Sequence, residues 1–201
     1  MFLFQKTAAP CKTIGICALE HGSGTTCISL ALSHFLCNKM RKKTAYIELN
    51  TSNQISSLSG KRQKTTFLFM GITFFPNVTL ARLPEILQKR FDYFVLDMGI
   101  LNTNTAYEFS RCQKQFLVGS MSLWKQEKTV KNLEQLQKIT NMNQEHMVFL
   151  GNPMIKESLC SGRFKAFSKV ISVPFIENPF QIASKDFSFF ESLLERNKYT
   201  T

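Results

Sequence analysis

The segment covering residues 13–39 constrains the fold of this chain more than any other. An apolar run over residues 13–19 leads into the turn Gly22-Ser23-Gly24-Thr25-Thr26, after which apolar residues recur at helical spacing. In a strand–turn–helix unit of this kind, backbone N–H groups of the turn and of the helix N-terminus point at one place and favour an anion there. A working phosphate-binding loop carries a lysine directly before its Ser/Thr, and here Thr25 fills that position. The unit therefore predicts the architecture of a phosphate-binding loop without its usual lysine.

Segments typical of strands and helices alternate along the rest of the chain. Strands are expected at residues 44–49, 91–97, 115–119, 147–151 and 170–173. Helices are expected at residues 80–90, 104–112, 122–140 and 186–196. Apolar residues 67–75 are interrupted by Gly71 and fit either two short strands or one bent strand. Residues 50–64 lack apolar periodicity, so we expect an exposed loop there.

This alternation is typical of a layered α/β fold with a mostly parallel sheet. No linker, internal repeat or second composition regime interrupts the sequence. We therefore expect a single three-layer α/β domain over residues 1–201, with its core over residues 13–196.

The chain is strongly basic, with 25 Lys and Arg against 14 Asp and Glu and a formal net charge of +11. Such a charge favours anionic partners, which include nucleic acid, acidic lipid and an acidic protein face. Two clusters contribute much of it, namely Lys39, Arg41, Lys42 and Lys43, and then Lys61, Arg62 and Lys64. The sequence does not show whether they share one face, so non-specific DNA binding stays open as an alternative function.

The cysteines and the hydropathy of the chain indicate the cellular compartment in which we expect the protein. The six cysteines include no CxxC pair, so we expect no zinc site. Cysteines within apolar runs suit a reducing cytoplasm. No segment approaches the roughly 20 apolar residues that cross a bilayer. We expect a cytoplasmic protein without a transmembrane segment, which a partner could hold at a membrane surface.

Three segments together resemble the MinD/ParA-like family of P-loop ATPases, which carry a deviant Walker A motif. The family motif reads KGGxGK[ST]T, and residues 20–26 occupy its first seven positions, so that Glu20 and Thr25 replace the two lysines. Residues 45–50 resemble the family's second strand, where Glu48 keeps one acidic position and Asn50 replaces the residue associated with water activation and magnesium. Residues 92–99 resemble the Walker B strand, with Asp97 as its aspartate.

The resemblance implies which residues would meet a nucleotide. The phosphates would lie against Gly22, Ser23, Gly24, Thr25 and Thr26. Thr26 and Asp97 would hold Mg²⁺, and Asn152, which ends a segment resembling the adenine-reading strand, would contact the base. The cofactor would then be ATP or ADP with Mg²⁺.

The replaced lysines allow equally that no cofactor binds. A lost charge-assisted contact weakens binding by roughly 1.5–3 kcal/mol, and Glu20 would add repulsion. An amide such as Asn50 cannot act as a base. We therefore expect no catalytic residue and no efficient ATP hydrolysis.

A narrower resemblance, carried by segments such as residues 118–124, is to short uncharacterised relatives from Gram-positive anaerobes; TadZ/CpaE-like proteins are better-known relatives with eroded loops. It implies a degenerate scaffold or localisation factor with protein partners, in pilus or secretion assembly, and the family implies a homodimer. Trp124 fits either a core or helix-start position or an exposed position at a partner surface. Two alternatives remain open: an ATP-binding switch ATPase with an atypical loop, and the DNA-binding protein.

Overall fold

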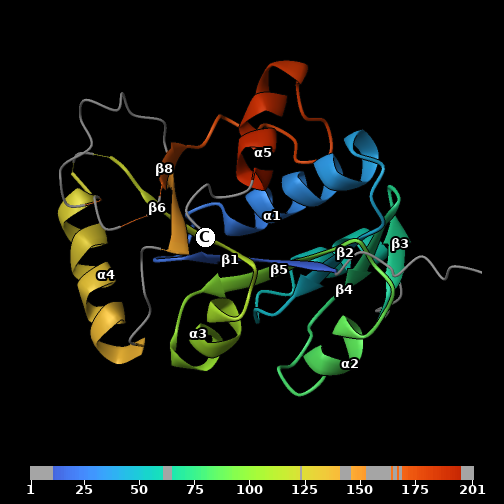
Figure 1. Cartoon of the computed structure of the whole chain (residues 1–201), viewed down its shortest axis with the longest axis horizontal. Helices are drawn as coiled ribbons and strands as arrows, with labels where there is room; N and C mark the ends of the chain where they lie inside the picture. The colour runs from blue at the N-terminus through green and yellow to red at the C-terminus, as the bar shows by residue number, and fades with distance from the viewer. Residues whose placement is uncertain are drawn as a thin grey trace, which may run out of the picture.

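A computed structural model describes residues 11–60, 65–122, 124–140, 146–152, 164, 167 and 169–195. At its centre lies an eight-stranded sheet with the strand order β3-β4-β2-β5-β1-β6-β7-β8 (Figure 1). Neighbouring strands are parallel except β3 and β4, which form an antiparallel hairpin at one edge. The strands are β1 Lys12–Ala18, β2 Thr44–Glu48, β3 Phe67–Phe69, β4 Ile72–Phe75, β5 Tyr93–Ile100, β6 Lys114–Ser120, β7 Met147–Asn152 and β8 Lys169–Ser172.

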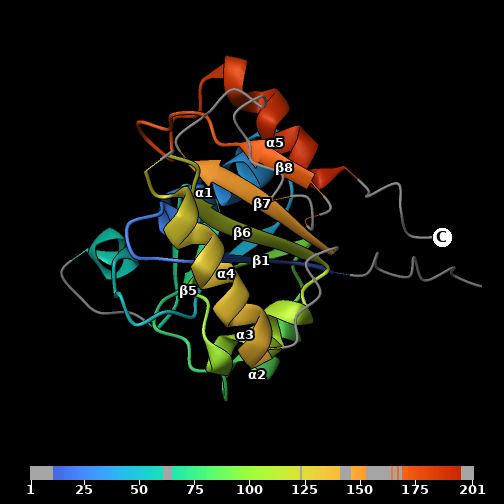
Figure 2. The same cartoon turned by 90° about the vertical axis from the view of Figure 1, so that its left-hand side faces the viewer.

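Helices cover both faces of this sheet, as Figures 1 and 2 show from two sides. One face is covered by α1 (Thr25–His34), which continues as a π-helix over Phe35–Lys39, and by α5 (Phe187–Leu194). The other is covered by α2 (Leu83–Leu87), α3 (Thr103–Ser110) and α4 (Gln126–Thr140). These layers confirm the expected three-layer α/β fold with a mostly parallel sheet.

Strand β1 shows why the sequences of the central strands are continuously apolar. Its side chains alternate between the two cores, with Ile14 and Ile16 packed under α1 and Cys17 in the core on the opposite face. Both faces of the strand are therefore buried, as in parallel sheets generally. Gly15 lies so close to α3 that a Cβ atom would come within 2.9 Å of the Phe109 ring in that helix and 2.8 Å of the Cys112 Sγ atom just after it. The glycine thus allows α3 to pack directly on the strand.

The apolar segment at residues 67–75 forms two short strands, one of the two expected arrangements. Met70 and Gly71 between them have φ angles of 47° and 80°. Two successive residues with positive φ are typical of the tight turn that joins a two-residue hairpin. The interruption at Gly71 therefore marks a reversal of the chain rather than a bend within one strand.

Two sequence expectations were wrong in extent. The helix expected at residues 80–90 is confined to α2, with Pro84 in its first turn. Within the expected exposed loop at residues 50–64, a 3₁₀-helix η2 forms over Ile55–Ser59, and Ile55 is buried in the core beside Tyr46. Residues 61–64, which include one of the two basic clusters, lie outside the described residues. No helix in the described part of the chain is long and apolar enough to cross a membrane.

Candidate functional site

The turn between β1 and α1 lies at the carboxyl edge of the sheet. Strand β1 sits between β5 and β6, and the helices that follow β1 and β5 cover opposite faces. Where the connections from two neighbouring strands leave on opposite faces of the sheet, a crevice forms at the carboxyl ends of the strands. Open α/β sheets bind ligands in such a crevice. The loop predicted from the glycines therefore lies where this fold places a ligand site.

Glycine conformation shapes the loop. Gly22 and Gly24 have φ angles of 76° and 93°, a region that glycine adopts without steric cost. Gly24 caps α1, and no side chain supplies a capping hydrogen bond there. Amide groups at a helix N-terminus without such a cap favour an anion. The loop thus has the backbone of a phosphate site although it lacks the lysine.

A pocket of about 630 Å³ opens over this loop. Its walls are formed by residues 20–27 of the loop and α1, by residues after β2 that include Asn50, and by residues 98–100 of β5. All five loop residues predicted to meet phosphate, Gly22 to Thr26, line it. A volume in this range is typical of small-molecule and cofactor sites.

Asp97 connects three elements beneath the pocket. Its carboxylate is fully buried, and Oδ2 accepts hydrogen bonds from the Thr26 hydroxyl and the Tyr46 hydroxyl, each at 2.7 Å. Oδ1 accepts the Gly99 N–H at 3.2 Å. Burial, followed by the charge of Asp97, raises the pKa of Tyr46 well above its ordinary value. The tyrosine therefore stays a neutral donor to this carboxylate.

The pair Thr26 and Asp97 fits the chemistry of a magnesium site. A hydroxyl and a carboxylate oxygen in contact at the base of a phosphate loop are hard oxygen ligands, which Mg²⁺ prefers together with phosphate and water. The structure brings the two predicted metal residues together at 2.7 Å. Within the described ranges, no three His, Cys, Asp or Glu side chains gather around one point. A metal here would therefore depend on phosphate and water for its remaining ligands.

Glu48 has a structural position rather than one in the pocket. Its buried carboxylate accepts hydrogen bonds from the N–H groups of Gln54 at 2.9 Å and Asn77 at 3.1 Å. Asn50, by contrast, lines the pocket, and its amide nitrogen donates to the Asp97 backbone carbonyl at 3.3 Å. The position that the family resemblance links to water activation is thus occupied by an amide that cannot take a proton.

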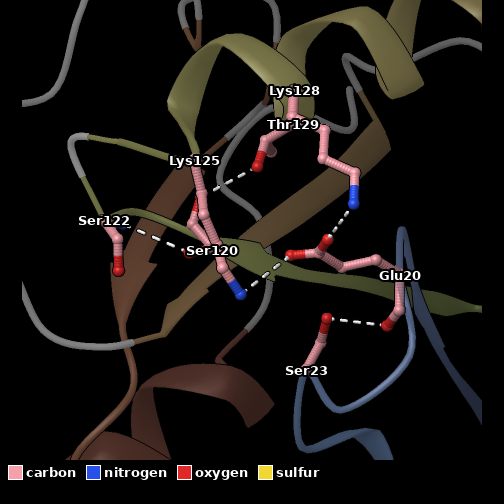
Figure 3. Close-up of polar contacts among 7 residues, drawn as sticks. All are labelled: Glu20, Ser23, Ser120, Ser122, Lys125, Lys128 and Thr129. Atoms are coloured by element: carbon pink, nitrogen blue, oxygen red, sulfur yellow. Dashed lines mark hydrogen bonds and ion pairs between the residues drawn. The ribbon is translucent and has the colours of Figure 1, made fainter.

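Glu20 is paired with two lysines that sequence reasoning missed. Figure 3 shows Lys125 and Lys128, at the start of α4, reaching its two carboxylate oxygens at 3.7 and 3.2 Å. The expected repulsion from Glu20 is therefore offset within the chain. The lysines stand more than 100 residues from Glu20 in the sequence, and only the adjacency of β1 and β6 brings them together.

Two further predicted positions had different outcomes. The Trp124 side chain is 82% exposed, which excludes the core position. Asn152 pairs with Ser120 at the carboxyl ends of β7 and β6, the edge that holds the loop. The Asn152 side chain lies outside what the structure describes, so its contact with a base stays a prediction.

Neither a protein-family model nor a curated protein matches this sequence. Solved structures do match. A protein from Borrelia burgdorferi described as a plasmid partition protein and bound to AMPPNP is 14% identical, with a TM-score of 0.62 over 92% of this chain and 97% of that one. Apo McdA from Cyanthece is 13% identical, with a TM-score of 0.63 over 92% and 99% of the two chains.

The septum site-determining protein MinD from Pyrococcus horikoshii, complexed with Mg-ADP, is 16% identical, with a TM-score of 0.50 over 80% of this chain and 81% of that one. At such identities the matches establish the fold. The chain has the α/β fold of the ParA and MinD ATPases, with the mostly parallel sheet and flanking helices of P-loop NTPases.

Proposed function

We propose that this chain is a nucleotide-responsive scaffold or localisation factor that binds ATP or ADP at residues 22–26 and hydrolyses ATP slowly or not at all. The observation that carries this proposal is the contact between the Thr26 hydroxyl and the Asp97 carboxylate beneath an uncapped glycine loop. Support also comes from two proteins of this fold, which bind AMPPNP and Mg-ADP.

Mg²⁺, when bound, would neutralise phosphate charge and hold the phosphate oxygens in place. Thr26 and Asp97 would hold the ion, the Asp97 carboxylate after releasing one hydroxyl donor or through water. Tyr46 would keep its hydrogen bond to the same carboxylate and so fix its orientation. The backbone N–H groups of the loop would bind the phosphates themselves.

We expect slow hydrolysis because of the residues that line the pocket. Attack of water on a phosphate needs a group that orients the water and charge that stabilises the transition state. Asn50 can accept and donate hydrogen bonds but cannot act as a base, and the loop itself carries no lysine. Nucleotide would therefore act as a bound effector rather than as a consumed substrate.

The test is calorimetric titration of the purified chain with ATP and ADP, with and without Mg²⁺. We expect binding that Mg²⁺ strengthens, loss of that strengthening in Thr26→Val, and loss of binding in Gly24→Arg, which places a large side chain at a positive φ. Absence of binding at millimolar nucleotide would overturn the proposal. ATP turnover that Asp97→Ala abolishes would instead favour the switch ATPase.

The cellular role is proposed from the sequence resemblance alone. A degenerate member of this fold would act through protein contacts, and the TadZ/CpaE-like relatives connect such a role to pilus or secretion assembly. Its test is affinity capture of the chain from its own cells in the presence of ATP or ADP. Recovery of the same partners by Gly24→Arg would contradict a nucleotide-responsive role.

DNA binding is a second candidate, and one observation favours it. Lys12, Lys114 and Lys169 are the first residues of β1, β6 and β8, at the amino edge of the sheet. Burial and the nearby charges of Lys12 and Lys169 lower the pKa of Lys114, although Glu195 opposes the shift. Ammonium groups along one edge suit a polyanion such as the phosphate backbone of DNA, although that of Lys114 also donates to the Glu195 carbonyl at 2.6 Å.

Salt dependence tests this second candidate. Binding of duplex DNA should weaken steeply as salt rises from about 50 mM, because bound cations release counterions. We expect Lys12→Ala/Lys169→Ala to weaken binding, and the matched pair Lys125→Ala/Lys128→Ala, at the opposite edge, to leave it unchanged. Flat salt dependence, or no binding at about 50 mM salt, would contradict it.

A further inference from the structure

The ion pairs between Glu20 and helix α4 hold two cations beside a loop that has lost its own. Glu20 lines the pocket, and its side chain is 17% exposed. The Lys125 and Lys128 side chains are 50% and 68% exposed, and their ammonium groups lie at 3.7 and 3.2 Å from different oxygens of that carboxylate. One carboxylate and two ammonium groups sum to a charge of +1. Neither lysine lines the pocket itself, but the ion pairs bring two cations next to a residue that does.

Hydrogen bonds fix where α4 begins. The Thr129 hydroxyl donates to the Ser120 carbonyl at 3.1 Å, and the Lys125 N–H donates to the Ser122 carbonyl at 2.8 Å. Ser120, Ser122 and Thr129 are buried. These contacts attach the first turn of α4 to the end of β6 (Figure 3). Strand β6 neighbours β1, so the lysines are held beside the loop by the sheet itself.

The side chains of the two lysines are held only by exposed ion pairs, whereas the backbone at the start of α4 is fixed by hydrogen bonds. Ion pairs between exposed groups contribute little to stability, because water screens them and ordering the side chains has an entropic cost. A lysine has a flexible four-carbon stem, so its ammonium group can move while the helix stays in place. An incoming phosphate can therefore compete with Glu20 for these ammonium groups.

We propose that Lys125 and Lys128 provide, from the start of α4, the positive charge that the loop lacks, and that Glu20 keeps both ammonium groups beside the loop until a phosphate binds. This inference rests on the proposed nucleotide binding. It assigns each residue a distinct role: the lysines contact the phosphates of the bound nucleotide, and Glu20 positions the lysines. Removing the lysines should therefore weaken affinity, whereas removing the Glu20 charge should not.

The experiment compares ATP affinity by calorimetry in the wild type and three variants. Lys125→Ala/Lys128→Ala should weaken binding about 10- to 100-fold, the range for loss of a charge-assisted contact. Glu20→Gln should bind as tightly as the wild type or more tightly, because it releases both lysines. Lys131→Ala is the matched control and should be unchanged, since Lys131 lies on the same helix and pairs with Glu127 at 2.9 Å.

Thermal unfolding of each variant separates loss of affinity from loss of fold. If the double variant binds ATP like the wild type, the inference is overturned and the proposed function stands. If Glu20→Gln weakens binding as much as the double variant does, the ion pairs only brace the loop, and the inference is again overturned. If the folded wild type binds no nucleotide, the proposed function fails and the inference fails with it.

Discussion

At the scale of single residues, the Asp97 carboxylate connects three elements at the carboxyl edge. Its carboxylate receives hydroxyl groups from α1 and β2 and an amide from its own strand. A buried carboxylate is tolerated only with several such donors, because each offsets part of its lost hydration. The same donors set the orientation in which it would meet a magnesium ion.

Removing one of these donors should lower stability. We expect Tyr46→Phe to reduce the free energy of unfolding by roughly 1.5–3 kcal/mol, the range for a hydrogen bond to a charged group. Chemical denaturation measures this change. Tyr107→Phe is the control, because Tyr107 is exposed and should change stability by less than about 0.5 kcal/mol. Equal effects of the two substitutions would contradict the role given to Tyr46.

Buried thiols should make the protein lose stability in alkali. Burial, and then the charge of Glu108, raises the pKa of Cys112 from 9.0 to about 12, and burial raises the pKa of Cys17 well above 9.0. Between pH 9 and 12 the unfolded chain releases these protons while the folded chain keeps them. Stability is thus retained below pH 9 and falls as pH rises toward 12.

Each such thiol contributes a slope of up to about 1.4 kcal/mol per pH unit. We expect Cys112→Ala to show a shallower loss of stability over this range, in denaturation curves recorded at a series of pH values. The slope is the informative quantity, since the substitution also leaves a cavity that lowers stability at every pH. A slope equal to that of the wild type would contradict the assignment.

At the scale of elements, the sequence predicts the strands best and the chain between them least. Residues 44–48 and 93–98 are buried on both faces, so apolar runs locate β2 and β5 almost without regard to the rest of the fold. The glycines, Thr26 and Asp97 could be placed together because β1 and β5 both end at one edge. Helix η2 could not be predicted from the sequence. The family resemblance assigns Glu48 to the site, whereas its carboxylate accepts hydrogen bonds from N–H groups of the loop that contains η2.

The Glu48 carboxylate should therefore matter for the loop after β2. We expect Glu48→Ala to lower the free energy of unfolding by roughly 2–4 kcal/mol, because it leaves buried N–H groups without their charged acceptor. Limited proteolysis should also cut residues 50–60 sooner than in the wild type. Glu85→Gln provides the control, since Glu85 forms an exposed pair with Lys89. An unchanged digestion pattern in Glu48→Ala would contradict this role.

At the scale of the whole molecule, the two edges of the sheet differ in chemistry. The carboxyl edge holds the pocket, the glycine loop and the paired Glu20, whereas the amino edge begins with Lys12, Lys114 and Lys169. A nucleotide and a polyanion could thus bind at opposite edges without competing. The double variants at each edge, described above, can separate the two activities.

Trp124 offers a readout for assembly, because it is the only tryptophan of the chain and is 82% exposed at the carboxyl edge. Large aromatic side chains are often central to interfaces. We expect a homodimer formed through this edge to bury the indole, so that its emission shifts to the blue as protein concentration rises. Size-exclusion chromatography should show the larger species over the same range. A dimer with unchanged emission would place the interface elsewhere.

The hydrogen bonds around Asp97 also bear on how such a chain can evolve. Because its carboxylate joins α1, β2 and β5 through hydrogen bonds within the chain, replacing it should harm folding. Selection for a stable protein would then preserve this aspartate after selection for catalysis had ended. This architecture therefore favours retention of the aspartate in any chain that keeps the fold.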